Sequence, residues 1–167
     1  MNNVGAVGGG IGAMALGLAV LAYQIGQWRG GDYTPKVHFC MGVALAALLF
    51  LGGGVLGAMG GHAAVLGQGI GTYALEQATG ASVAGAKGGH RLTGGEKVGV
   101  TGAITGIVIL CFYLGIFKSG RKDLVPPVVK GSLVGIWLGT SAGLLGMAMG
   151  LIRTSGNTVG MIFTSTL

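Results

Sequence analysis

The stretch VGVTGAITGIVILCFYLGIF, residues 98–117, carries no charge and is bracketed by Lys97 and Lys118. A helix needs about 20 apolar residues to cross the hydrocarbon core of a bilayer, and this stretch has that length. It therefore predicts a transmembrane helix. Three further apolar runs predict spans at residues 5–28, 38–60 and 131–152.

The composition excludes several classes of protein. Charged residues make up 8% of the chain, against about 25% in a soluble globular domain. Hydrophobic residues reach 51%, which excludes a disordered chain, and three prolines are too few for collagen. Glycine accounts for 38 of the 167 residues. We therefore expect an all-α membrane protein with four transmembrane helices in a single membrane domain, residues 1–167.

The two halves of the chain resemble each other, which indicates two tandem helical hairpins, residues 5–60 and residues 98–152. Glycine-rich chains also align with themselves by chance, but the order aromatic, basic, Gly, Asp, Pro, Lys occurs in both connecting loops and favours duplication. Both hairpins would have the same orientation. The matching segments are 4–12 with 98–106, 28–36 with 117–130, and 56–60 with 145–150.

Two segments lie outside the hairpins. In the linker, residues 61–96, Leu66, Ile70 and Tyr73 recur at helical spacing. They predict an amphipathic helix that lies in the membrane interface or extends the second span, followed by a flexible loop. In the C-terminal tail, residues 153–167, alternating apolar residues predict an extended segment.

Basic residues are concentrated in the two short loops, which the positive-inside rule places in the cytoplasm. The chain is then a multi-pass protein of the inner, cytoplasmic membrane with both termini outside. We expect these bases to contact lipid headgroups or to line a lumen. They are Arg29, Lys36, Lys118, Arg121, Lys122 and Lys130.

Glycines recur at four-residue spacing, which makes grooves through which helix backbones approach closely. There are more such grooves than four helices need among themselves, and the surplus predicts a homo-oligomer. Contact within one monomer is the alternative reading. The helix-packing candidates are Gly53, Gly57, Gly61, Gly102, Gly106, Gly131, Gly135, Gly139 and Gly143.

Few residues are candidates for chemistry. Glu76 is the one acid in an apolar helical context and is a candidate ion site, although it falls on the polar face of its helix. Three histidines lack the spacing of metal ligands, so we expect no metal. No Ser/His/Asp or Cys/His arrangement is evident, so we expect no enzymatic activity.

The hairpin at 5–60 with its loop Trp28–Lys36, and the hairpin at 98–152 with its loop Phe117–Lys130, resemble the pilins of conjugative and type IV secretion systems. Those pilins are small Gly/Ala-rich hairpins with a short basic cytoplasmic loop. Typical members have one hairpin and a cleaved leader. Type IV secretion systems also contain small multi-span inner-membrane components, and this chain fits that description too.

The resemblance implies a structural subunit that assembles with copies of itself and with other subunits of the secretion apparatus. By this resemblance the subunits would leave the membrane and stack into an extracellular filament. The loop bases would then meet lipid headgroups or transported DNA. No cofactor is expected, and bound phospholipid is the one candidate ligand.

Three alternatives stay open. The duplicated proteolipid of rotary ATPases is similar in size and glycine content, but it carries a carboxylate in its last span, and residues 131–152 have none. A holin-like pore is compatible with the number of spans. A small multi-span transporter would use Gln24, Gln27, Thr105 and Thr140 as its polar groups.

Overall fold

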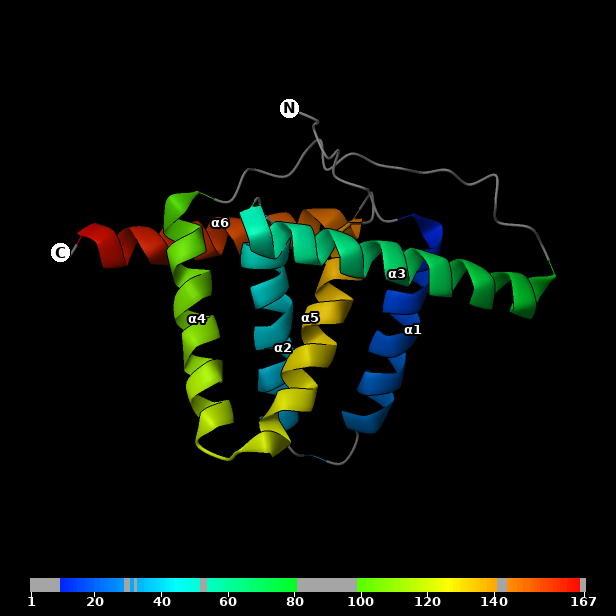
Figure 1. Ribbon diagram of the computed structural model, residues 1–167, viewed down its shortest axis with the longest axis horizontal. Helices are drawn as coiled ribbons and strands as arrows, with labels where there is room; N and C mark the ends of the chain where they lie inside the picture. The colour runs from blue at the N-terminus through cyan, green and yellow to red at the C-terminus, as the bar shows by residue number, and fades with distance from the viewer. Residues whose placement is uncertain are drawn as a thin grey trace.

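A computed structural model describes residues 10–28, 31, 33–51, 54–80, 99–140 and 144–165. These residues are helical apart from turns and short connections, which confirms the all-α class. Some predictions lie outside the described residues: those on Arg29, Gly53, Gly143 and the flexible loop of the linker. Figure 1 shows a row of upright helices side by side and further helices lying across their upper ends.

The upright helices follow the order of the four apolar runs. They are α1 (Ile11–Gln27), α2 (Thr34–Leu45), which continues as the π-helical η2 (Ala46–Phe50), α4 (Val100–Lys118) and α5 (Val125–Gly139). At the lower end α1 ends and α2 begins, and α4 is joined there to α5 through the 3-10 turn η3 (Lys122–Leu124). We call this the loop end. Proline stands in the first turn of α2 and of α5, where its missing N–H costs nothing.

Two long helices run across the upper end, α3 (Gly54–Thr79) and α6 (Leu144–Ser165). The direction of the chain changes by 115° between the α2–η2 rod and α3. The predicted second span, 38–60, is therefore wrong at its end, because the upright rod stops at Phe50. The sequence is apolar through the bend, so composition did not mark it.

The predicted fourth span, 131–152, is wrong in the same way. The upright helix begins at Val125 and ends at Gly139, and a separate helix starts at Leu144. The C-terminal tail is helical to Ser165, not extended. The alternation of apolar residues arises because two exposed ones, Val159 and Met161, stand on either side of Gly160. Gly160 itself packs on the α4 backbone at Thr101.

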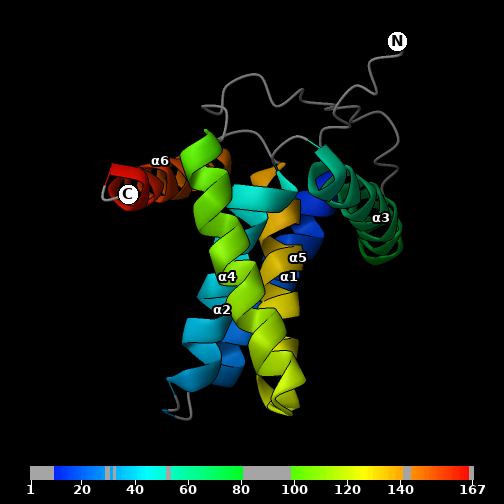
Figure 2. The same ribbon diagram turned by 60° about the vertical axis from the view of Figure 1, so that its left-hand side comes forward.

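The central pair is α2 and α5, with α4 on one side and α1 on the other (Figures 1 and 2). Each lying helix packs on the first upright helix of its own half, α3 on α1 and α6 on α4. It also caps that helix. The Gln68 side-chain oxygen accepts from the Ala13 N–H at 3.0 Å, and the Asn157 oxygen accepts from the Gly99 N–H at 3.1 Å. These bonds satisfy donors that a helix start leaves free.

The two halves correspond at a constant offset of 89 residues. A β-carbon added at Gly42 would collide with the Val128 carbonyl, and one added at Gly131 would collide with the Phe39 carbonyl. Likewise, a β-carbon added at Gly71 would collide with the Gly12 carbonyl, and one added at Gly160 would collide with the Thr101 carbonyl. The predicted duplication fits this pattern. The match of 4–12 with 98–106 is wrong in register, because it pairs Gly12 with Gly106, 94 residues apart, whereas the structure pairs Gly17 with Gly106.

One helix of the described chain, α4, is long and apolar enough to cross a membrane by itself. The α2–η2 rod passes the same criterion only together with α3, and α1 is apolar but shorter. Figure 2 shows α3 and α6 projecting on different sides of the bundle.

Candidate functional site

The structure brings the described loop bases together at the loop end. Lys36 lies in the first turn of α2, with its ammonium nitrogen 4.8 Å from the centre of the Tyr33 ring. Lys118 ends α4, and Arg121 and Lys122 lie at η3. Lys130 lies exposed in the second turn of α5.

One carboxylate, Asp123, accompanies these bases among the described residues of the loop end. It lies 3.3 Å from Arg121, and both side chains are exposed. Such a pair contributes little to stability because water screens it. The loop end therefore keeps a net positive charge, suited to an anionic surface.

Most described candidate glycines pack within the chain. Gly131 lies against the α2 backbone, Gly135 against Val43 and Ala46, and Gly139 against Leu51 and Met149. In addition, Gly106 lies against Leu48 and Leu49, Gly102 is buried, and Gly57 is half-buried.

Other glycines face open space. A β-carbon added at Gly61 would have no described atom within 4 Å, and the same holds for its counterpart 89 residues later, Gly150. Gly26 on α1 and its counterpart Gly115 on α4 are also open. These four open positions thus form two corresponding pairs, one position of each pair in either half.

Glu76 is not in the upright bundle. It lies half-buried near the far end of α3, which projects beyond the upright helices (Figure 1). The Glu76 carboxylate thus lies outside the upright helices and not in the middle of one. The described parts of α1, α2, α4 and α5 contain no Asp or Glu.

The role of Arg153 is not evident from the sequence, in which it directly follows the apolar run 131–152. Its side chain is 5% exposed, and its Nε donates to the Ala47 carbonyl at 3.2 Å. In the π-helix the Leu51 N–H donates to the Ala46 carbonyl, five residues back, and so does not occupy the Ala47 carbonyl. Burial lowers the pKa of the Arg153 guanidinium, which nevertheless stays charged at neutral pH.

His38 also has a structural partner that the sequence did not reveal. Its Nδ1 lies 2.7 Å from the Tyr113 hydroxyl, joining α2 to α4 near the loop end. In the described part of the chain, no three His, Cys, Asp or Glu side chains are grouped so that they could hold a metal ion.

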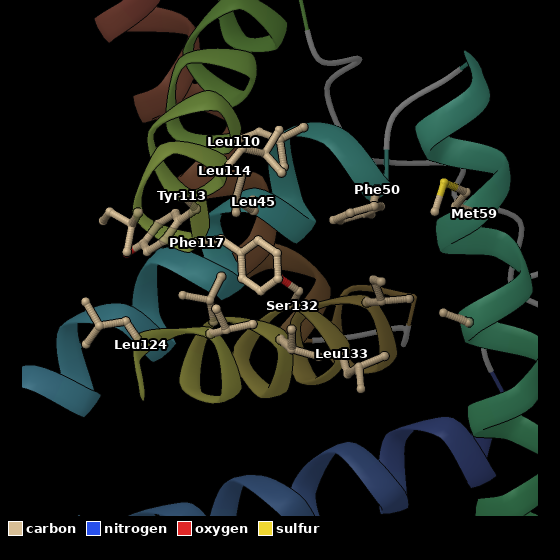
Figure 3. Close-up of a pocket in the computed structure, with 16 residues that line it drawn as sticks. Leu45, Phe50, Met59, Leu110, Tyr113, Leu114, Phe117, Leu124, Ser132 and Leu133 are labelled. Carbon is tan, nitrogen blue, oxygen red and sulfur yellow. The ribbon is translucent and has the colours of Figure 1, made fainter. Parts of the chain in front are cut away.

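An apolar groove of about 360 Å³ runs between α4 and α5. Its floor is formed by Leu45 and Phe50 of the α2–η2 rod, and α3 closes its upper end with Met59 and Ala63. Figure 3 shows the Phe117 ring pointing from α4 into this space. The groove starts at the loop end, where it is lined by Leu124, the last residue of η3.

Comparison with models of protein families, with curated proteins and with solved structures found no match.

Proposed function

We propose that the chain is a structural, self-assembling membrane subunit of a secretion or conjugation apparatus, similar to a pilin. Its four upright helices cross the cytoplasmic membrane, with the loop end in the cytoplasm and the ends of the chain outside. The observation that carries the proposal is the outer surface of α4. Large apolar side chains cover it, including Ile107, Val108 and Phe112, which are 49%, 54% and 60% exposed.

The length of α4 supports membrane insertion. At about 1.5 Å per residue, the 19 residues of α4 extend about 28 Å, close to the roughly 30 Å hydrocarbon core. The loop bases then lie at the cytoplasmic headgroups. The lying helices fit the outer interface, because α3 leaves Leu66, Ile70 and Tyr73 exposed along one stripe.

Self-assembly is supported by the open glycines of the outer upright helices. Gly26 lies near the end of α1 and Gly115 near the end of α4, and these two helices stand on opposite sides of the bundle (Figure 1). Backbones approach closely at such positions, and in lipid this packing drives helix association. In the proposed assembly, α1 of one copy packs at Gly26 on α4 of the next copy at Gly115.

A rotary-ATPase proteolipid is less well supported, because the described upright helices carry no carboxylate and Glu76 lies on α3. The pilin-like assembly needs no such group. Transported DNA and other subunits of the apparatus are the proposed partners of the loop end.

Disulfide cross-linking in membranes tests the assembly. Cys40 and Cys111, both exposed, are first replaced by serine. The double variant Gly26→Cys, Gly115→Cys should give a ladder of cross-linked multimers on oxidation, because each copy offers both partners of a head-to-tail contact. Each single variant should stay largely monomeric.

The matched control pairs Gly26→Cys with Gly69→Cys, which is equally open but lies on α3. It should give no ladder. A monomer in the Gly26/Gly115 double variant, or a ladder of equal length in the control, would overturn the proposed contact.

A further inference from the structure

The groove between α4 and α5 is a place where the two halves differ. In the first half, the Trp28 ring packs edge-on against Phe39, with the ring centroids 5.2 Å apart. The residues 89 positions later are Phe117 and Val128. Valine offers no ring for Phe117 to pack on, and Phe117 is 52% exposed. The first half therefore fills this space with two rings, whereas the second half leaves it open.

The lining of the groove is suited to a hydrocarbon chain. Among the described residues that line it, Tyr113 and Ser132 carry hydroxyls, and the others are apolar. The Tyr113 hydroxyl is hydrogen-bonded to His38, and the Ser132 hydroxyl donates to the Gly42 carbonyl at 3.1 Å. Both polar groups already have partners, so a polar ligand or a row of waters would find little to bind.

The charges stand at one end of the groove. Lys118 follows the lining residue Phe117, and Lys130 follows the lining residue Val129, both with exposed side chains. Arg121 and Lys122 precede Leu124, which lines the lower end. The upper end is formed by apolar residues of η2 and α3. The site thus joins an apolar channel to a cationic mouth.

We propose that this groove binds one acyl chain of an anionic phospholipid, whose headgroup contacts the bases at the loop end. Lys118, Arg121, Lys122 and Lys130 bind the phosphate, and the chain runs upward between α4 and α5. This inference rests on the membrane insertion proposed above, but it does not depend on self-assembly.

The test compares two Val→Phe changes by native mass spectrometry of purified protein. The probes are phosphatidylglycerol and phosphatidylcholine with identical chains. Val129 lines the groove and is 50% exposed, whereas Val108 lies on α4 outside the groove lining and is 54% exposed. Val129→Phe should lower retention of phosphatidylglycerol about tenfold, the equivalent of excluding roughly two methylene groups. Val108→Phe should leave retention unchanged.

A second variant tests the headgroup. Replacing Lys118, Arg121 and Lys122 by glutamine changes exposed side chains only, so the fold should persist. Wild-type protein should prefer phosphatidylglycerol, and the triple variant should retain both lipids about equally. Lys36→Gln, at the first-half loop, is the control and should keep the preference.

Equal losses in Val129→Phe and Val108→Phe, or a loss in neither, would overturn the inference, because the bound lipid would then be a general coat. An unchanged lipid preference in the triple variant would overturn the headgroup assignment. If Val129→Phe removed the cross-linked ladder but kept the lipid, the groove would be a contact between copies instead. Absence of the ladder alongside selective lipid loss would refute the assembly and leave this inference intact.

Discussion

The first half, residues 10–80, and the second half, residues 99–165, build the same arrangement from sequences that differ at most positions. Glycine is kept at two pairs of close backbone crossings, Gly42 with Gly131 and Gly71 with Gly160. Side chains that fill gaps are not kept, as at Phe39 and Val128. The comparison teaches that close backbone crossings fix the architecture, while gap-filling residues are free to diverge and create a site.

Two hydrogen bonds that tie a lying helix to an upright one also differ between the halves. In one, Trp137 of α5 donates from its Nε1 to the Ala63 carbonyl of α3 at 2.9 Å. In the other, Arg153 of α6 donates to the Ala47 carbonyl of η2. Each tie links a lying helix to a central rod of the opposite half, but the donor sits on the upright helix in one case and on the lying helix in the other.

The largest effect is expected at the crossing of α2 and α5. Gly131→Ala and Gly42→Ala each place a β-carbon on a backbone carbonyl that cannot move away without separating the helices. Each should lower the free energy of unfolding by about 3 kcal/mol, measured by denaturant titration in detergent. Gly69→Ala, in open space, is the control and should not destabilise.

The two crossing variants should agree closely, because the halves correspond there. A large loss at one glycine and none at the other would break the correspondence of the two halves at their centre.

Arg153→Ala should have the next largest effect. The position 89 residues earlier is Ala64, so the change gives the second half the residue of the first. It removes a hydrogen bond from a charged donor and leaves the Ala47 carbonyl of η2 without that partner. We expect a loss of about 2 kcal/mol in the same titration.

Ser155→Ala, exposed on the same helix, provides the baseline. If Arg153→Ala matched that baseline, the tie between α6 and η2 would contribute nothing, and the π-helix would need another explanation.

Tyr113→Phe should cost about 1 kcal/mol, because it removes one neutral hydrogen bond, the bond to His38 that joins α4 to α2. The matched control is Tyr23→Phe, whose hydroxyl accepts from Gln27 within the exposed face of α1. That change should have no measurable effect on unfolding. Equal losses would show that the contact between α2 and α4 is not special.

Much of this architecture could be predicted from the sequence, because apolar runs between charges mark helices and prolines mark helix starts. The bends after Phe50 and Gly139 could not, since both sides of each bend are apolar. The repeat register was missed at its start because short glycine runs match at several offsets. The contacts there, such as Gly17 on Leu138 and Gly106 on Leu49, give an offset of 89, which also separates the starts of the other two matching pairs, 28 with 117 and 56 with 145.

The basic loop end was predictable from the charge pattern, whereas the groove was not. The groove depends on which helices are neighbours: α4 packs on the α2–η2 rod, and the resulting space is filled or open according to the pair Phe39 and Val128. Arg153 likewise gained its role from the π-helix, whose register no local sequence pattern marks.

The smallest expected effect is a gain at the open glycines of the lying helices. Gly61→Ala and Gly150→Ala add a methyl group where no described atom lies within 4 Å. Alanine loses less backbone freedom on folding than glycine, so each change should raise the free energy of unfolding by about 0.5 kcal/mol in dispersed monomers. The two gains should be equal, since the positions correspond. A gain at one position and a loss at the other, measured in monomers, would show that α3 and α6 have diverged in packing as well as in sequence.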